Sequence, residues 1–139
     1  MSIPATDAIA RKIGQDPFAK WMGMDLEELT PGHSRVAMTL TPAMLNFHGI
    51  PHGGAIFSLA DAAFAAASNS HGQMAVALSM TIHYLAAAQP GARLVAEARE
   101  LRKGHRSAFY QITVRTEGGE VIAICQGVVH RKPESVVEG

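Results

Sequence analysis

The sequence has little of what several classes of protein require. Its 139 residues include a single cysteine, Cys125, so no disulfide can form within the chain. Positive and negative side chains balance, with 12 Lys plus Arg against 12 Asp plus Glu. A neutral chain has no overall field to attract nucleic acid or an anionic membrane surface, and we expect neither as a partner.

Long apolar runs are also scarce. The main candidate, residues 53–67, is shorter than the about 20 residues that a membrane-spanning helix needs, and it contains Asp61. The opening “MSIPATDAIARKIG” has no continuous apolar region of the kind found in secretion signals, which together with the lone cysteine predicts a cytoplasmic protein. The length suits one core, so we expect a single domain over residues 1–139.

The first third of the chain predicts helices and then strands. Residues 1–22 are expected to form a helical segment, made of “TDAIARKIG”, with Thr6 as a candidate N-cap, and “DPFAKWMGM”, with Pro17 at its first helical position. Two strands are expected in “DLEEL” and “SRVAMTLT”, on either side of a “TPG” turn. A long helix then begins at the glycine pair of residues 53–54.

The last half of the chain predicts a sheet. Turn-forming clusters separate four strand-like runs, “AVALSMTIHYL”, “ARLVAEARELR”, “SAFYQITVRT” and “EVIAICQGVVHRK”, which indicates an antiparallel meander. Residues 133–139 are expected to form a loose tail. Because the long helix is apolar on nearly every side, the sequence predicts an α+β fold in which a curved antiparallel sheet of five to six strands wraps around one central helix.

The start of this helix is a candidate binding site for negative charge. Backbone N–H groups at Gly53 and Gly54 precede the first helical hydrogen bonds, so they point out of the helix end. With the positive end of the helix dipole, such donors suit a carbonyl oxygen that gains charge during a reaction. The alternative is that two glycines simply make a tight turn into the helix.

Asp61, in the middle of the same helix, needs an explanation. A carboxylate among apolar side chains costs several kcal/mol unless it is paired, hydrogen-bonded or protonated. Its neighbours Leu59, Ala60, Ala62 and Ala63 offer no partner. We interpret Asp61 as a functional carboxylate, against the alternative of a structural one bonded to a strand or facing solvent.

The spacing of these two candidates predicts how they can act together. Gly53 and Asp61 are eight residues apart, which places them roughly 12 Å apart along one helix. They cannot serve the same carbonyl within one chain. If both are catalytic, the aspartate must come from a second copy whose helix runs antiparallel to the first, which predicts a homodimer with two composite sites.

Residues 46–72 contain a specific pattern of Asn46, Gly49, His52, Gly53, Gly54, Ile56, Phe57, Leu59, Ala60, Asp61 and Ala63, followed by “NSHG”. With this pattern the chain resembles, over most of its length, the hotdog-fold acyl-CoA thioesterases of the phenylacetate-pathway, or PaaI-like, type. The resemblance implies two chains paired edge to edge into one sheet, which often pair again into tetramers, and it implies hydrolysis of an acyl-CoA without cofactor or metal.

The same resemblance implies a role for each candidate. The Gly53 amide would hydrogen-bond the thioester carbonyl, which Asn46 helps to position, and His52 would lie near the sulfur. Asp61 of the partner subunit would act as general base or as nucleophile. Ser79, on the following strand, would orient the carboxylate or the water, with Thr81 on the same strand face as the other hydroxyl available.

Histidine and basic side chains give weaker signals. His48 and His52 are four residues apart, but glycine and proline lie between them and break any helix, so we do not expect a metal site. The basic residues Arg102, Lys103 and Arg106 sit at a predicted hairpin, where they either hold the phosphates of coenzyme A or form a solvated turn. Further basic residues, His130, Arg131 and Lys132, end the last strand.

Three functions remain open from the sequence. The first is hydrolysis of an aryl-acyl-CoA such as phenylacetyl-CoA or hydroxyphenylacetyl-CoA, with medium-chain fatty acyl groups as the alternative. The second is a hotdog hydratase or dehydratase, which would need a histidine and acid pair at the helix start. The third is a protein that binds acyl-CoA without turnover. The pattern “HGG” and the retained Asp61 favour hydrolysis.

Overall fold

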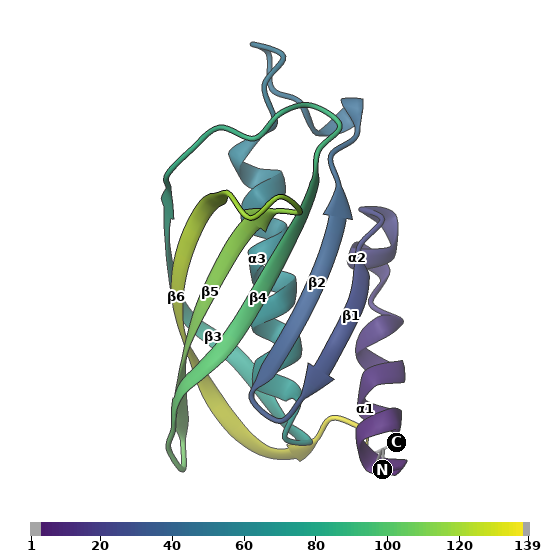
Figure 1. Cartoon of the computed structure of the whole chain (residues 1–139). Helices are drawn as coiled ribbons and strands as arrows, with labels where there is room; N and C mark the ends of the chain where they lie inside the picture. The colour runs from purple at the N-terminus through teal and green to yellow at the C-terminus, as the bar shows by residue number, and fades with distance from the viewer. Residues whose placement is uncertain (1–3, 138–139) are drawn as a thin grey trace.

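A computed structural model describes residues 4–137 and shows one curved antiparallel sheet with a long helix lying across one of its faces (Figure 1). The predicted α+β architecture of a curved antiparallel sheet around one long helix is therefore confirmed. In chain order the elements are α1 (Pro4–Gly14), α2 (Pro17–Trp21), β1 (Asp25–Thr30), β2 (His33–Thr39), the 3-10 turn η1 (Pro42–Met44), α3 (Gly53–Asn69), β3 (Gln73–Tyr84), β4 (Arg93–Lys103), β5 (Ser107–Thr116) and β6 (Val121–Ser135).

The strand order corrects the predicted meander. The sheet runs β1-β2-β4-β5-β6-β3, so β4, β5 and β6 form a meander but β3 pairs with β6 at the far edge. Residues 85–92, read from sequence as a hairpin connection, instead cross one end of the sheet from β3 to β4 (Figure 1). The cause is α3, which spans the inner face of the sheet and delivers the chain to the edge opposite β1 and β2.

The ends of the chain also differ in detail from the expectation. Helix α1 starts at Pro4, so Thr6 lies within the helix and does not cap it. Helix α2 has Pro17 at its start, as predicted, and the Asp16 carboxylate accepts a hydrogen bond from the Ala19 N–H at 2.8 Å. Strand β6 continues to Ser135, so the start of the expected loose tail belongs to the sheet, and residues 138–139 lie outside the described chain.

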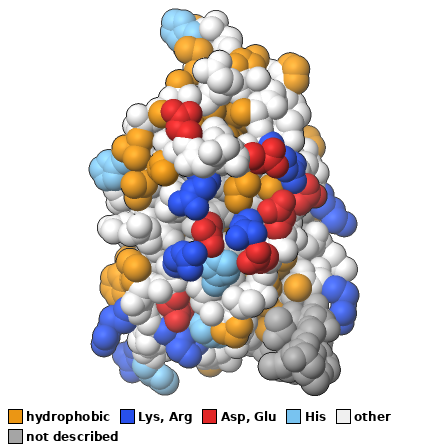
Figure 2. All heavy atoms as spheres, viewed as in Figure 1, with side chains coloured by type: hydrophobic (Ala, Val, Ile, Leu, Met, Phe, Trp, Pro, Cys, Tyr) orange, Lys and Arg blue, Asp and Glu red, His pale blue; other side chains and the backbone are white. Residues whose placement is uncertain are grey.

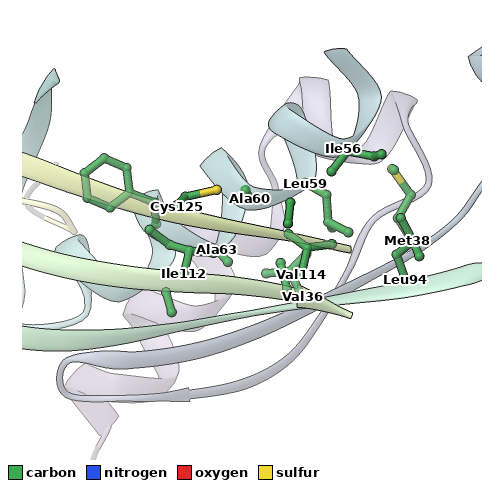
Figure 3. Close-up of a cluster of buried hydrophobic side chains, with 14 of the residues drawn as sticks. Val36, Met38, Ile56, Leu59, Ala60, Ala63, Leu94, Ile112, Val114 and Cys125 are labelled. Carbon is green, nitrogen blue, oxygen red and sulfur yellow. The ribbon is translucent and has the colours of Figure 1, made fainter. Parts of the chain in front are cut away.

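The core lies between α3 and the inner face of the sheet (Figure 3). Small side chains on α3, such as Ala60 and Ala63, are completely buried and let the helix approach the strands closely. At Gly127 of β6 the ring of Phe64 lies so close to the backbone that an added Cβ would be 2.5 Å from its Cζ. Only glycine leaves room for the aromatic ring of Phe64 at this position, and the contact of Phe64 with Gly127 holds α3 against β6.

One stripe of α3 faces away from the sheet. Gly54, Asp61 and Ala65 are exposed in the single chain, at spacings of seven and four residues that keep them on one side of the helix. The sheet therefore covers only part of the helix surface, and this stripe is left uncovered in the single chain. None of the helices in the described part of the chain is long and apolar enough to cross a membrane.

Candidate active site

The N-terminus of α3 presents an unused amide. His52 is the N-cap, and its Nδ1 accepts a hydrogen bond from the Gly54 N–H at 2.8 Å. Because Nδ1 is an acceptor, a neutral His52 ring carries its proton on Nε2. The N–H of Gly53, the first helical residue, has no acceptor among residues 4–137. This end of the helix therefore offers the predicted donor, with a second N–H at His52 Nε2 close by.

Tyr84, at the end of β3, supports this donor and was missed in the sequence. Its hydroxyl donates a hydrogen bond to the Gly53 carbonyl at 2.9 Å. Its ring lies so close that a Cβ on Gly53 would be 3.3 Å from both Cζ and the hydroxyl oxygen. Desolvation raises the pKa of Tyr84, so the phenol stays a neutral donor. The available signal was the alternation of Met80, Ile82 and Tyr84 along one strand face.

Asn46 organises the loop before the helix. Its side-chain oxygen accepts hydrogen bonds from the N–H groups of His48 at 2.9 Å and Ile50 at 3.1 Å. The backbone adds bonds from the Asn46 N–H to the Ile50 carbonyl and from the Gly49 N–H to the Asn46 carbonyl. Asn46 thus shapes the loop that leads into His52 and Gly53, while its side-chain NH₂ has no acceptor among residues 4–137.

Asp61 lies on the exposed stripe of α3 in the single chain. Neither a hydrogen bond nor an ion pair joins its carboxylate to the rest of the described chain. Desolvation by the surrounding protein, followed by repulsion from Asp16, raises the pKa of Asp61 above its ordinary value of 3.8. A carboxylate without a structural partner and with a raised pKa is suited to accept a proton.

Gly53 and Asp61 open into different cavities. A hollow of about 400 Å³ beside the helix start is lined by Gly53, Ile56 and Tyr84 together with residues 85–88. A second cavity of about 490 Å³ lies between α3 and the α1–α2 segment and includes Asp61 in its wall. Neither residue lines the other's cavity, so one chain does not bring the donor and the carboxylate together.

Ser79 lies on the other side of the sheet from α3. Its neighbour Met80 pairs with Gly127, which contacts Phe64 of the helix, so Met80 faces the helix. Successive strand residues point to opposite faces, and Ser79 is exposed on the outer one, together with Thr81. A bulge between Ala77 and Ser79 shifts the alternation that sequence alone would assign.

The basic residues gather at the opposite end of the sheet from Gly53. Arg102, Lys103 and Arg106 belong to the β4–β5 hairpin, and the end of β6 joins them through a hydrogen bond from the Arg131 N–H to the Arg106 carbonyl at 2.7 Å. Figure 2 shows this concentration of Lys, Arg and His at the lower left of the molecule, whereas the middle of the sheet mixes both signs of charge. In a single chain these cations lie far from the helix start (Figure 1).

A metal centre has no support in the described residues. Across residues 4–137 no three His, Cys, Asp or Glu side chains lie together as metal ligands do. His52 is used as a helix cap through Nδ1, and His48 lies in the loop that Asn46 shapes. Cys125 is buried, and desolvation raises the pKa of its thiol to about 11, which keeps it protonated and unreactive at neutral pH.

Comparison with known proteins places this geometry in a family. Residues 48–123 match the family described as the thioesterase superfamily. The acyl-coenzyme A thioesterase PaaI of Escherichia coli is 40% identical over 116 residues, which cover 84% of this chain and 83% of that protein. The solved structure of the E. coli PaaI protein, from the phenylacetic acid degradation operon, superposes with a TM-score of 0.89 over 94% of this chain and 95% of that one.

Two further solved structures are similar. The phenylacetic acid degradation protein PaaI of Thermus thermophilus, solved as a mutant, is 40% identical with a TM-score of 0.81, over 84% of this chain and 100% of that one. A Streptococcus mutans protein, solved with acetyl-CoA bound, is 27% identical with a TM-score of 0.77, over 81% and 90% of the two chains. The chain therefore belongs to the thioesterase superfamily, in the group of hotdog-fold proteins that includes PaaI.

Proposed function

We propose that this protein hydrolyses aryl-acyl-CoA thioesters, such as phenylacetyl-CoA or hydroxyphenylacetyl-CoA, to the free acid and CoA. The observation that supports this proposal is that α3 has two groups without a partner in the described chain: the Gly53 N–H at its start and the Asp61 carboxylate eight residues later. The substrate class is supported by the relatives: E. coli PaaI is named as an acyl-coenzyme A thioesterase, and its operon is one of phenylacetic acid degradation.

In the proposed reaction the Gly53 N–H hydrogen-bonds the thioester carbonyl oxygen, which gains negative charge as the carbonyl carbon is attacked. Asp61 of the partner subunit either takes a proton from the attacking water or attacks the carbon itself. The carbon–sulfur bond then breaks, and the CoA sulfur leaves as a thiolate that the His52 Nε2–H stabilises by a hydrogen bond. If Asp61 acts as the base, it then passes the proton taken from water to the thiolate or to solvent. If Asp61 attacks the carbon, water hydrolyses the resulting acyl–Asp61 anhydride and restores the carboxylate. Asn46 holds the loop that positions this donor pair. Because Ser79 faces away from α3, the proposal gives it no part in the reaction.

A two-fold pairing of β3 with its copy would complete the site. Strand β3 is an edge strand with exposed Met74, Val76 and Leu78, and it contains none of the Lys or Pro residues that usually protect an edge. Antiparallel pairing sets the Tyr84 end of one β3 beside the Gln73 end of the other. It therefore brings the helix start of one chain toward the middle of its partner's helix. We propose this homodimer, paired again as a dimer of dimers, as the working assembly in the cytoplasm.

The same pairing gives the basic hairpin a role. Gln73 hydrogen-bonds Arg131, so the start of β3 belongs to the basic end of the sheet. Across the two-fold axis this end lies next to the partner's helix start, where the CoA portion of the substrate leaves the site. We therefore propose that Arg102, Lys103 and Arg106 contact the phosphates of CoA bound at the partner's Gly53.

The test is a measurement of thiol release from a panel of acyl-CoAs with a thiol reagent. We expect phenylacetyl-CoA to be hydrolysed with a higher kcat/KM than octanoyl-CoA. The panel also separates the other candidates, since enoyl-CoA hydration without thiol release would identify a hydratase, and binding with neither reaction would identify a carrier. The hydratase is not favoured by the geometry, because no carboxylate among residues 4–137 bonds to the His52 ring.

Tyr84→Phe is expected to lower kcat about tenfold, with KM for the acyl-CoA nearly unchanged. The hydroxyl touches the Gly53 carbonyl and not the substrate, so its loss loosens the orientation of the donor rather than substrate binding. Tenfold corresponds to about 1.4 kcal/mol, near the upper end of the range for one lost neutral hydrogen bond. Steady-state kinetics decide the matter: an unchanged kcat would mean that Tyr84 only packs. His83→Phe, on the neighbouring position of β3, is the matched control and should retain full activity.

A further inference from the structure

We infer that the cavity between α3 and the α1–α2 segment is the pocket for the acyl group, and that it is built for a compact aromatic ring. The inference rests on the proposed function and adds the place in this chain where the aryl group binds and the residues that limit its size. The cavity has a volume of about 490 Å³, which lies within the roughly 300–1,000 Å³ typical of small-molecule sites.

Small residues on α3 create this space. Ala62, Ala65 and Ala66 lie on the helix side that faces the α1–α2 segment, where longer side chains would fill the gap. The facing wall combines apolar side chains with the polar Lys12, Gln15 and Asp16 of the α1–α2 segment. Its apolar part consists of Phe18 from α2, Met24 just before β1, Leu26 from β1 and Val36 from β2. The N-terminal helical segment therefore acts as the outer wall of the cavity rather than as an appendage of the sheet.

The position of Asp61 connects the cavity to the chemistry. Its carboxylate lines the cavity, so a thioester carbon within reach of Asp61 stands at the cavity wall. The acyl chain and the sulfur are bonded to that carbon in different directions. One of them therefore extends into the cavity beside Asp61, and the other extends toward the partner's Gly53. The Gly53 side belongs to the partner chain in the composite site, and it adjoins the basic hairpin in the proposed dimer.

Charge decides which part of the substrate enters. The cavity is lined by the carboxylates of Asp16 and Asp61 but by one cation, Lys12. This balance repels the phosphates of CoA and disfavours acyl groups that carry a carboxylate of their own, such as succinyl. A neutral, apolar acyl group remains as the occupant, with its carbonyl at the Asp61 edge.

The wall favours an aromatic occupant. Phe18 lines the cavity, is half exposed, and stands 5.9 Å from the ring of Trp21, so an added ring would extend an existing aromatic pair. Met24 adds a thioether, which makes favourable contacts with aromatic rings. An aryl group bound here would also cover Phe18, which the single chain leaves in solvent.

Ala65→Leu tests the pocket. Ala65 is exposed, so a larger side chain enters the cavity without disturbing the core. We expect kcat/KM for phenylacetyl-CoA to fall about tenfold or more, while that for acetyl-CoA, whose methyl group does not reach the wall, changes by less than about threefold. Phe18→Ala is the second variant, and it should lower the preference for phenylacetyl-CoA over octanoyl-CoA by a similar factor.

The possible outcomes distinguish a wrong pocket assignment from a wrong assignment of the thioesterase function. Selective loss with the longer acyl groups supports the pocket, provided that light scattering shows an unchanged oligomer. Equal losses for acetyl-CoA and phenylacetyl-CoA, or unchanged selectivity in both variants, overturn the pocket and leave the thioesterase function standing. If the native protein releases no thiol from any acyl-CoA, the proposed function fails, and the pocket assignment fails with it.

Discussion

Asp61→Asn is expected to lower kcat for thioester hydrolysis by about 10²–10⁴-fold, the range found when a general base is removed. The amide keeps the size of the side chain but cannot take a proton from water or form an acyl intermediate. Since no described residue bonds to the carboxylate, the substitution breaks no structural contact. The measurement is thiol release from phenylacetyl-CoA at saturating substrate, with Glu120→Gln, an exposed carboxylate between β5 and β6, as the matched control.

The pH dependence gives a second signature of the same residue. Because desolvation raises the pKa of Asp61, the acid limb of kcat/KM should lie at a higher pH than for an ordinary carboxylate of pKa 3.8. In the native protein the rate falls as pH drops through this raised value. The residual activity of Asp61→Asn should lack that limb. Retention of both the rate and the acid limb in the variant would remove Asp61 from the mechanism.

The stability of Asp61→Asn should change in the opposite direction to its activity. A pKa raised in the folded state means that the charged carboxylate disfavours folding, and this penalty is fully present above the folded pKa. It decreases as pH falls through the folded pKa and is absent well below the ordinary value of 3.8, where the group is protonated in both states. We therefore expect Asp61→Asn to have a higher Tm than the native protein at pH 7, and this gain to vanish in acid.

The sequence predicted those parts of the site that local signals specify. A glycine pair before a long apolar run marks the start of α3, and His52, as the residue before it, falls at the cap. Asp61 became a candidate only because a carboxylate within an apolar run has a high desolvation cost. The side on which it lies was not predictable, because a helix that is apolar almost all round has no periodicity to distinguish the face that contacts the sheet.

The features that the sequence missed depend on pairing between distant segments. Tyr84 bonds to Gly53 across 31 residues, and this contact exists only because β3 lies at the edge next to β6. Loop length did not predict that order, since the alanine-rich connection of residues 85–92 suits either a hairpin or a crossover. The outward position of Ser79 follows from a bulge, and a single inserted residue reverses every face assignment after it.

Gly53→Pro is expected to lower kcat about 10²–10³-fold while α3 stays folded. Proline has no N–H, so the proposed donor to the carbonyl oxygen is lost, and removal of one such donor has this effect in comparable sites. The first position of a helix tolerates proline because its N–H has no helical partner. Gly53→Ala is the matched control, since it keeps the N–H and adds a Cβ that must displace Tyr84 slightly from 3.3 Å. Alanine should therefore lose far less activity than proline.

Mixed dimers then test whether the donor and the carboxylate come from different chains. Gly53→Pro and Asp61→Ala proteins, each inactive alone, are unfolded together in equal amounts and refolded. Random pairing makes half of the dimers mixed, and each mixed dimer has one site with both residues intact, so about a quarter of the native activity should return. Sites built within one chain would regain nothing, because every chain carries a defect. Mixed dimers can be isolated with two different affinity tags, one on each variant. If these mixed dimers remain inactive, the cross-chain site is ruled out, even if the β3 edges pair as proposed.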